Sequence, residues 1–164
     1  MIVYIQGMSA PDKFQSAAAV LLREAFEGIP QGQKYTWFVE KREGIFDALE
    51  SLDAEAASRK PAPQLSSAAG HAYHMLYALR WANTPQGRPR PEGDWESTWA
   101  RQSVSREEWA DVQANIRSEY ELFIAWFDSN TDWERENSEI SALGSLPHLA
   151  YHLGALRQIV VAAH

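Results

Sequence analysis

Histidine has the clearest chemical meaning in this sequence, because four of its five copies form two closely spaced pairs. His148 and His152 are four positions apart, and His71 and His74 are three positions apart. On an α-helix both spacings place the two imidazoles on one face, with Cβ atoms about 5–6 Å apart. Helical proteins build metal sites from such side chains on facing helices. The two pairs therefore predict a metal site between two helices.

The residues around the second pair limit the chemistry. Leu149 follows His148, so the glutamate base of the His-Glu-x-x-His zinc proteases is absent. The chain has no cysteine, which excludes a thiolate ligand and a cysteine nucleophile of its own. No Ser-His-acid arrangement, nucleophile elbow or glycine-rich phosphate loop is visible. Neutral imidazoles accept zinc, nickel, iron or copper, so the ligands alone do not identify the metal.

Either upstream histidine is suitable as the third ligand. On a helical wheel His71 lies nearer the centre of the apolar stripe, which favours it as the inward residue. His74 lies on the same face about one turn later. A histidine on an apolar face is also a common hydrogen-bonded core residue, so the spacing alone leaves the third ligand open.

Apolar periodicity and capping residues predict four long helices. Ser66 or Ser67 is suited to cap the helix that carries the upstream pair, and Ser105 with Glu108 forms a capping box. The last helix begins either near Ser145 or near Ser138, with a bend at its proline in the second case. The first three long helices are expected over residues 11–27, 66–83 and 105–128.

Two other segments complete the predicted fold. Residues 37–52 carry a shorter apolar pattern, which favours one extra helix. Residues 84–95 contain three prolines and two glycines, which predicts a long crossover loop. No strand alternation and no internal repeat is visible. We therefore predict one all-α domain over residues 1–164, an up-and-down four-helix bundle with a short extra helix and a long crossover loop.

Composition restricts the partners. The net charge of −7 opposes binding to a phosphate backbone, so nucleic acid is not expected as a partner. No apolar run approaches the roughly 18 residues that a membrane span needs, and residues 1–5 are too short for a signal-peptide core. The absence of cysteine fits a reducing compartment. We expect a soluble, cytoplasmic protein.

The chain resembles the DinB/YfiT-like family of small metal-binding helical bundles. The segment from His148 to Gln158 has the family pattern of a histidine, three residues, His-Leu-Gly and then Leu-Arg-Gln. The residues Asp94-Trp95, Trp99 and 104–109 are similar to a subgroup of that family. The resemblance implies a three-histidine site in which the upstream ligand follows the capping serine by about seven residues and precedes an apolar residue. It thus favours His74 as the ligand, with His71 lining the pocket or supporting another ligand.

The resemblance also implies what the site does. Some relatives are thiol-dependent transferases, others are described as hydrolases, and members often form homodimers. We therefore expect a divalent metal (Zn, Ni or Fe), a low-molecular-weight thiol, a small-molecule substrate and pairing of two copies. The non-enzymatic alternative is a binding or stress-response module in which the metal only joins helices. Arg157, Tyr77 and Trp95 are candidate cofactor-binding residues, although packing roles fit them too, and Gly154 is expected to permit close helix packing.

Overall fold

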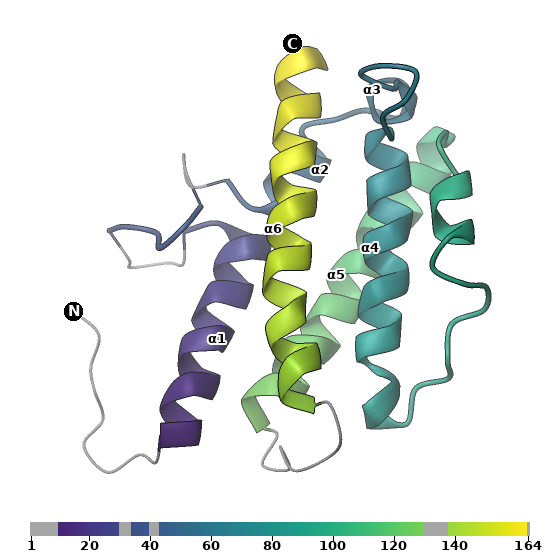
Figure 1. The fold of residues 1–164 in the computed structure, drawn as a ribbon. Coiled ribbons are helices and arrows are strands. Elements are labelled where there is room, and N and C mark those ends of the chain that lie inside the picture. Colours follow the sequence, from purple (N-terminus) through teal and green to yellow (C-terminus); the bar gives the residue numbers. More distant parts are fainter. Residues whose placement is uncertain (1–9, 30–33, 40–42, 130–137, 164) are drawn as a thin grey trace.

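The computed structural model describes residues 10–29, 34–39, 43–129 and 138–163, and its regular elements in these ranges are all helical (Figure 1). The predicted all-α class is therefore confirmed. None of the described helices is long and apolar enough to cross a membrane. The elements are, in chain order, α1 (Ala10–Glu27), α2 (Ile45–Glu50), α3 (Ala54–Ser58), α4 (Ala68–Ala82), the 3-10 helices η2 (Thr84–Gln86) and η3 (Ser97–Ala100), α5 (Arg106–Ser129) and α6 (Ser138–Ala163).

The four long helices pack in a ring, because α1 and α4 each contact both α5 and α6. The beginning of α4 lies beside the beginning of α5, since the Ser67 amide donates to the side-chain oxygen of Gln102. The end of α4 lies beside the middle of α5, where Asn83 donates to Glu119. Helices α4 and α5 are therefore parallel, and the predicted strict up-and-down alternation is wrong for this pair. The physical reason is the crossover of residues 83–105, which returns the chain to the starting end (Figure 1).

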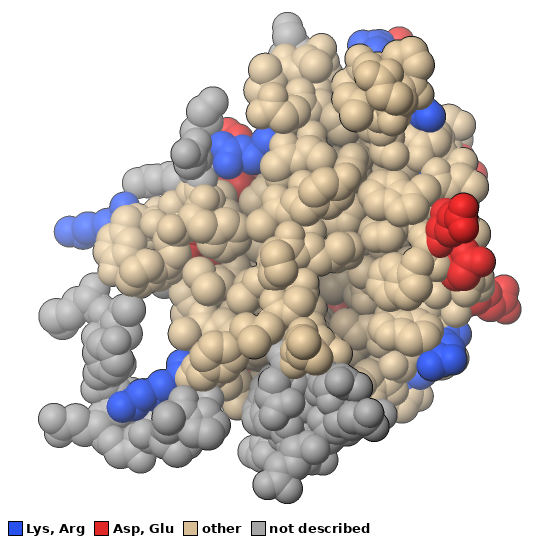
Figure 2. Space-filling view, viewed as in Figure 1, with Lys and Arg blue, Asp and Glu red and all other residues tan. Residues whose placement is uncertain are grey.

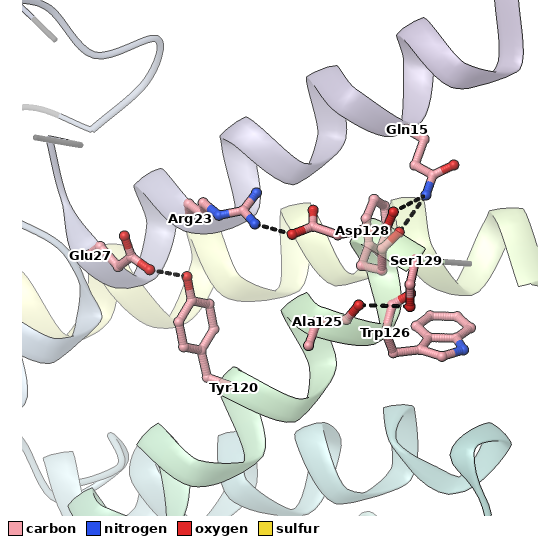
Figure 3. Close-up of polar contacts among 9 residues, drawn as sticks. Gln15, Arg23, Glu27, Tyr120, Ala125, Trp126, Asp128 and Ser129 are labelled. Carbon is pink, nitrogen blue, oxygen red and sulfur yellow. Dashed lines mark hydrogen bonds and ion pairs between the residues drawn. The ribbon is translucent and has the colours of Figure 1, made fainter. Parts of the chain in front are cut away.

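Helix α1 is antiparallel to α5, and polar side chains join the two helices (Figure 3). The Tyr120 hydroxyl donates to Glu27 at the end of α1, and Arg23 pairs with Asp128 near the end of α5. Gln15, near the start of α1, donates to a backbone carbonyl in the last turns of α5. These contacts set the register of α1 on α5. Apolar side chains from all four long helices then fill the core between them, among them Leu22, Phe26, Met75, Ile116, Phe127 and Leu156.

The predicted capping residues are confirmed. The Ser67 side chain accepts from the Gly70 amide and begins α4, and the Ser105 hydroxyl accepts from the Glu108 amide. The Glu108 carboxylate accepts in return from the Ser105 amide, which completes the capping box before α5. The sequence therefore fixes where these two helices begin.

The extra helix is shorter than predicted over residues 37–52. Among the residues of this range that the structure describes, 37–39 and 43–52, only Ile45–Glu50 is helical. The buried Glu24 carboxylate accepts hydrogen bonds from the backbone amides of residues 37, 38 and 39 at 2.7–2.8 Å, so these amides are not free to begin a helix. Gly44 then lets the chain pass close to α1, since a Cβ there would lie 2.4 Å from the Phe26 carbonyl oxygen.

Candidate metal centre

Helices α4 and α6 bring the two histidine pairs together. Ser67 fixes the start of α4 and so places His71 and His74 in its first two turns, both buried at 5% and 7% exposure. Helix α6 begins at Ser138 and contains Pro147, so the earlier of the two predicted starts is the observed one. One turn separates His148, which is partly exposed, from the fully buried His152.

Three histidines direct one ring nitrogen each to a common point. The Nε2 atom of His148 lies 3.1 Å from Nε2 of His74 and 3.1 Å from Nε2 of His152. Their ligand atoms all lie within 4.8 Å of one another. Two nitrogens bound tetrahedrally to one zinc ion at about 2.0–2.1 Å would be roughly 3.3 Å apart. The observed spacing thus fits three ligands of a single ion.

The Nδ1 atom of His74 is held by Thr98. Their separation is 2.7 Å, and the Thr98 hydroxyl also donates to the Trp95 carbonyl oxygen at 2.7 Å. Since the hydroxyl proton is used in that bond, the threonine oxygen accepts from His74 Nδ1–H. His74 is then the tautomer whose Nε2 carries a lone pair, as a metal ligand requires.

His71 lies outside the group of three and contacts it from behind. Its Nδ1 atom is 2.9 Å from Nδ1 of His152, so one of these nitrogens donates to the other. Donation by His152 leaves the lone pair of His152 on Nε2, toward the other two rings. His71 therefore lies where it can orient the His152 ring. His74 is one of the three converging histidines.

Burial keeps these rings neutral. Desolvation lowers the pKa of His71 and of His74 from 6.5 to about 4. It lowers the pKa of His152 to about 2, with a further contribution from its histidine neighbours, and it also lowers the pKa of His148. Neutral imidazole is the form that binds metal ions. Because the pKa values of these rings are lowered, protons compete only weakly with a metal ion for the ring nitrogens near neutral pH.

The protons of the neutral rings cannot satisfy every close contact between the converging nitrogens. With the protons of His74 and His152 on Nδ1, only His148 can place a proton between the three Nε2 atoms. A proton on His148 Nε2 can point at one neighbour only, so one 3.1 Å contact has no hydrogen bond, and with His148 protonated on Nδ1 both contacts bring two lone pairs together. A positive ion removes that repulsion. The donor set therefore fits a transition metal ion on chemical grounds as well as by distance.

The crossover loop forms an aromatic wall over this cluster. The Trp99 ring stacks on His74 at 4.1 Å between centroids and an angle of 21°, and it lies 5.7 Å from His152. Gln102 holds this part of the loop on α4, because it accepts from the Ser67 amide and donates to the Trp99 carbonyl. The connection between α4 and α5 therefore extends beyond the predicted loop of residues 84–95, and its further part carries Thr98 and Trp99, which contact His74.

The three predicted cofactor-binding residues take different places. Trp95 is 45% exposed, and its ring lies 5.7 Å from His74. Tyr77 is buried beside Trp95, and its hydroxyl donates to the Gly93 carbonyl at 3.2 Å. Arg157 is partly exposed, five residues after His152 on α6.

Gly154 was expected to permit close packing of α6 on another helix. A Cβ at Gly154 would meet nothing within 4 Å, so no described part of the chain packs closely there and that prediction is wrong.

Thr98 is the supporting residue that the sequence did not single out. It lies in η3, a short element with no periodic apolar pattern, and only its position three residues after Trp95 and directly before Trp99 marks it. Its function depends on how the loop folds over α4, and residue spacing within the loop does not show that.

Comparison with known families agrees with this geometry. The sequence profile of the DinB family matches residues 22–147, more than half of the chain. The chain belongs to the DinB family. The matched segment contains His71 and His74 and ends directly before His148, so the place of His148 and His152 in the candidate site rests on the three-dimensional arrangement. No curated protein and no solved structure matches the chain.

Proposed function

We propose that this DinB-family chain is a metal-dependent enzyme in which His74, His148 and His152 bind one divalent transition metal ion. The convergence of their Nε2 atoms at 3.1 Å is the observation that carries the proposal. Thr98 and His71 support the proposal. Thr98 hydrogen-bonds the second ring nitrogen of His74, and His71 hydrogen-bonds that of His152. Such outer partners fix the tautomer and orientation of metal-binding histidines. We interpret the ring of four long helices as the bundle that holds this site.

A site of this composition is suited to catalysis. In the described part of the chain, the group that could hold an ion contains three histidines and no carboxylate. Catalytic sites typically have three protein ligands and an open position, whereas structural sites are closed by four. An ion held by three neutral ligands would keep its full positive charge and so lower the pKa of a small thiol or of water near neutral pH.

A thiol is the nucleophile that these surroundings favour. The chain has no cysteine, so the thiol must come from a small molecule. Among the described residues no Asp or Glu hydrogen-bonds any of the four clustered histidines, so the ion itself would have to activate either nucleophile. The Trp95 ring is 45% exposed and lies 5.7 Å from His74, which gives a small molecule with an apolar part a surface to pack on beside the three histidines. Metal-activated hydrolysis is the second candidate function of the same site.

Cobalt substitution with thiol titration tests the proposal. Freshly purified protein should contain about one divalent ion per chain, and the cobalt form should develop a thiolate-to-metal absorption band as a small thiol is added. The His148→Ala protein is the control, which should show neither the stoichiometric ion nor the band. An unchanged cobalt spectrum at saturating thiol would contradict the thiol-dependent reading.

A structural role for the metal is the competing function, because the three ligands join α4 to α6. In that case chelation would lower the melting temperature, and added thiol would leave the cobalt spectrum unchanged. The enzymatic proposal expects chelation to lower the melting temperature as well. The thiol-dependent spectrum therefore separates the two functions, and the melt alone does not.

A further inference from the structure

Three aromatic side chains lie next to one another beside the histidine cluster. Tyr77 and Trp81 follow His74 on α4 at steps of three and four residues, so they lie on one face of the helix. The Trp95 ring packs across both, 4.9 Å from the Tyr77 ring and 6.2 Å from the Trp81 ring, at interplanar angles of 78° and 60°. Tyr77 is buried, whereas Trp81 is partly exposed and Trp95 is 45% exposed. We call Tyr77, Trp81 and Trp95 the aromatic corner.

Polar contacts hold the crossover against the aromatic corner. The Tyr77 hydroxyl donates to the Gly93 carbonyl at 3.2 Å, two residues before Trp95. Arg88 pairs with the buried carboxylate of Glu119 on α5, also at 3.2 Å. These contacts fix Trp95 relative to α4, so a ligand on this surface would not have to order it.

A positive charge already lies on the aromatic corner. The guanidinium carbon of Arg90 is 4.3 Å from the centroid of the Trp81 ring, within the roughly 6 Å of a cation–π contact. Arg88 has a buried carboxylate partner, whereas among the described residues no carboxylate forms an ion pair with Arg90. Arg90 is exposed, so its contact with Trp81 reflects the attraction of the ring face for a cation. Arg90 thus shows which kind of group this surface accepts.

Acidic side chains lie beside the exposed part of the aromatic corner. Asp94 and Glu96 flank Trp95 in the chain, Glu92 lies two residues before Asp94, and all three acidic residues are exposed. Figure 2 shows a group of acidic side chains at the edge of the molecule where Figure 1 draws the crossover. Residues 90–96 carry three carboxylates and one guanidinium. The local charge therefore favours a cation and opposes an anion.

We propose that the aromatic corner binds an ammonium or guanidinium group of a small molecule, which replaces Arg90 on the face of Trp81. Arg90 can move away easily, because it is exposed and no described carboxylate pairs with it. The ring faces attract the cation at short range, and the three carboxylates of residues 92–96 attract it at longer range. A neutral apolar molecule would contact the same rings without the contribution of the carboxylates.

The position of the aromatic corner sets the length of a ligand that also reaches the histidines. Trp81 follows His74 by seven residues on α4, which is roughly 10 Å along the helix axis. Trp95 lies between them, with its ring 5.7 Å from that of His74 and 6.2 Å from that of Trp81. A substrate with a cationic end and a reactive group roughly 10 Å away would contact both places. This last step rests on the proposed function, whereas cation binding itself needs no metal.

Three small molecules that differ in charge test the inference. Phenethylammonium, phenethyl alcohol and phenylpropionate share a phenyl ring and a short chain. Each is titrated into isotope-labelled protein as purified, and the indole N–H signals of Trp81 and Trp95 report binding at the aromatic corner. Both signals should shift with phenethylammonium, and its dissociation constant should be about 2-fold to 30-fold lower than that of the alcohol. The carboxylate should bind most weakly.

Removal of Arg90 gives a prediction in the opposite direction from removal of a ring. Arg90→Ala exposes the face of Trp81, so phenethylammonium should bind about 2-fold to 10-fold more tightly. Arg59→Ala changes the net charge equally at the end of α3 and should leave the dissociation constant unchanged. Trp81→Leu should weaken binding about 2-fold to 30-fold. Trp37→Leu is its control, because this exposed tryptophan lies on a different loop.

The His148→Ala protein separates this inference from the proposed function. It lacks one of the three converging rings, and it should still bind phenethylammonium with wild-type affinity because its aromatic corner is intact. Loss of binding in this variant would show that the amine binds a metal ion, and that result would overturn the inference. Equal affinity for the three molecules, or tightest binding of the carboxylate, would also overturn it. So would weaker binding to Arg90→Ala, since the guanidinium itself would then hold the ligand.

Discussion

The Nδ1 atoms of His71 and His152 lie 2.9 Å apart across the contact between α4 and α6. This contact explains why both upstream histidines are buried although only one lies among the three converging rings. His74 has its Nε2 directed to the common point, whereas His71 contacts the far side of the His152 ring. A hydrogen bond of this type raises the basicity of a metal-binding imidazole and fixes its orientation.

Replacement of His71 should therefore weaken metal binding without removing it. We expect His71→Ala to raise the dissociation constant for zinc about 10-fold to 100-fold, as loss of an outer hydrogen bond typically does. Competition with a chromophoric chelator measures the change. Unaltered affinity would show that the His71 contact does not support the ligand.

Replacement of a converging histidine should have a larger effect. We expect His148→Ala and His152→Ala to lose stoichiometric metal, because each removes one of three ligand atoms that lie within 4.8 Å of one another. Elemental analysis of the purified proteins measures the metal content. Full metal occupancy in either variant would refute this assignment, and His71→Ala is the control for loss of a neighbouring imidazole.

The residues of the candidate site, and the helices that carry them, were partly predictable from the sequence. The i,i+4 spacing of His148 and His152 and the Ser67 cap before α4 are local features, so they indicated the two helices that carry the site. The choice between His71 and His74 was not local. Both are buried on α4, and only the packing of α6 against that helix shows which ring converges with the others.

The fold differs from the prediction where distant residues compete with local pattern. The apolar pattern of residues 37–52 favoured a helix, yet Glu24 on α1 takes the amides of residues 37–39. Likewise, the prolines and glycines of residues 84–95 predicted a loop, but the sequence did not show that Thr98, just after it, would contact His74. Contacts between segments far apart in the chain decided both features.

Thr98 should tune the site through the tautomer of His74. Thr98→Val removes the oxygen that accepts from His74 Nδ1–H and keeps the shape of the side chain. We expect a loss of zinc affinity of about 10-fold to 100-fold. Thr98→Ser retains the hydroxyl and should restore near wild-type affinity. Equal affinities for the valine and serine variants would exclude this role.

Metal-free protein should lose stability in mild acid. The lowered pKa values of His71, His74, His148 and His152 mean that, below pH 6.5, the unfolded chain binds more protons than the folded one. Stability therefore falls as the pH decreases from about 6.5 toward 4, and it changes little above pH 7. For His71 alone, a folded pKa of about 4 corresponds to a loss of about 2 kcal/mol between pH 7 and pH 5.

Urea unfolding of chelator-treated protein at these two pH values measures the effect. The His71→Asn/His74→Asn double variant lacks two of the titrating groups, and its free energy of unfolding should depend less on pH. If the wild-type protein is equally stable at pH 5 and pH 7, the folded histidines are not held neutral.

Glu24 should contribute strongly to stability although it lies away from the histidines. Its carboxylate is fully buried and accepts from three backbone amides at 2.7–2.8 Å, which fixes residues 37–39 against α1. In Glu24→Gln the NH₂ group faces an amide N–H in place of an acceptor oxygen. Because a hydrogen bond to a charged group contributes about 1.5–3 kcal/mol and an unsatisfied buried donor adds a penalty, we expect the free energy of unfolding to fall by about 2–4 kcal/mol. Glu55→Gln is the matched control, because this carboxylate is exposed and forms an ion pair with the exposed Arg59, so its effect should stay within about 0.5 kcal/mol. Equal midpoints for the two variants in urea unfolding would show that the buried carboxylate does not hold this segment.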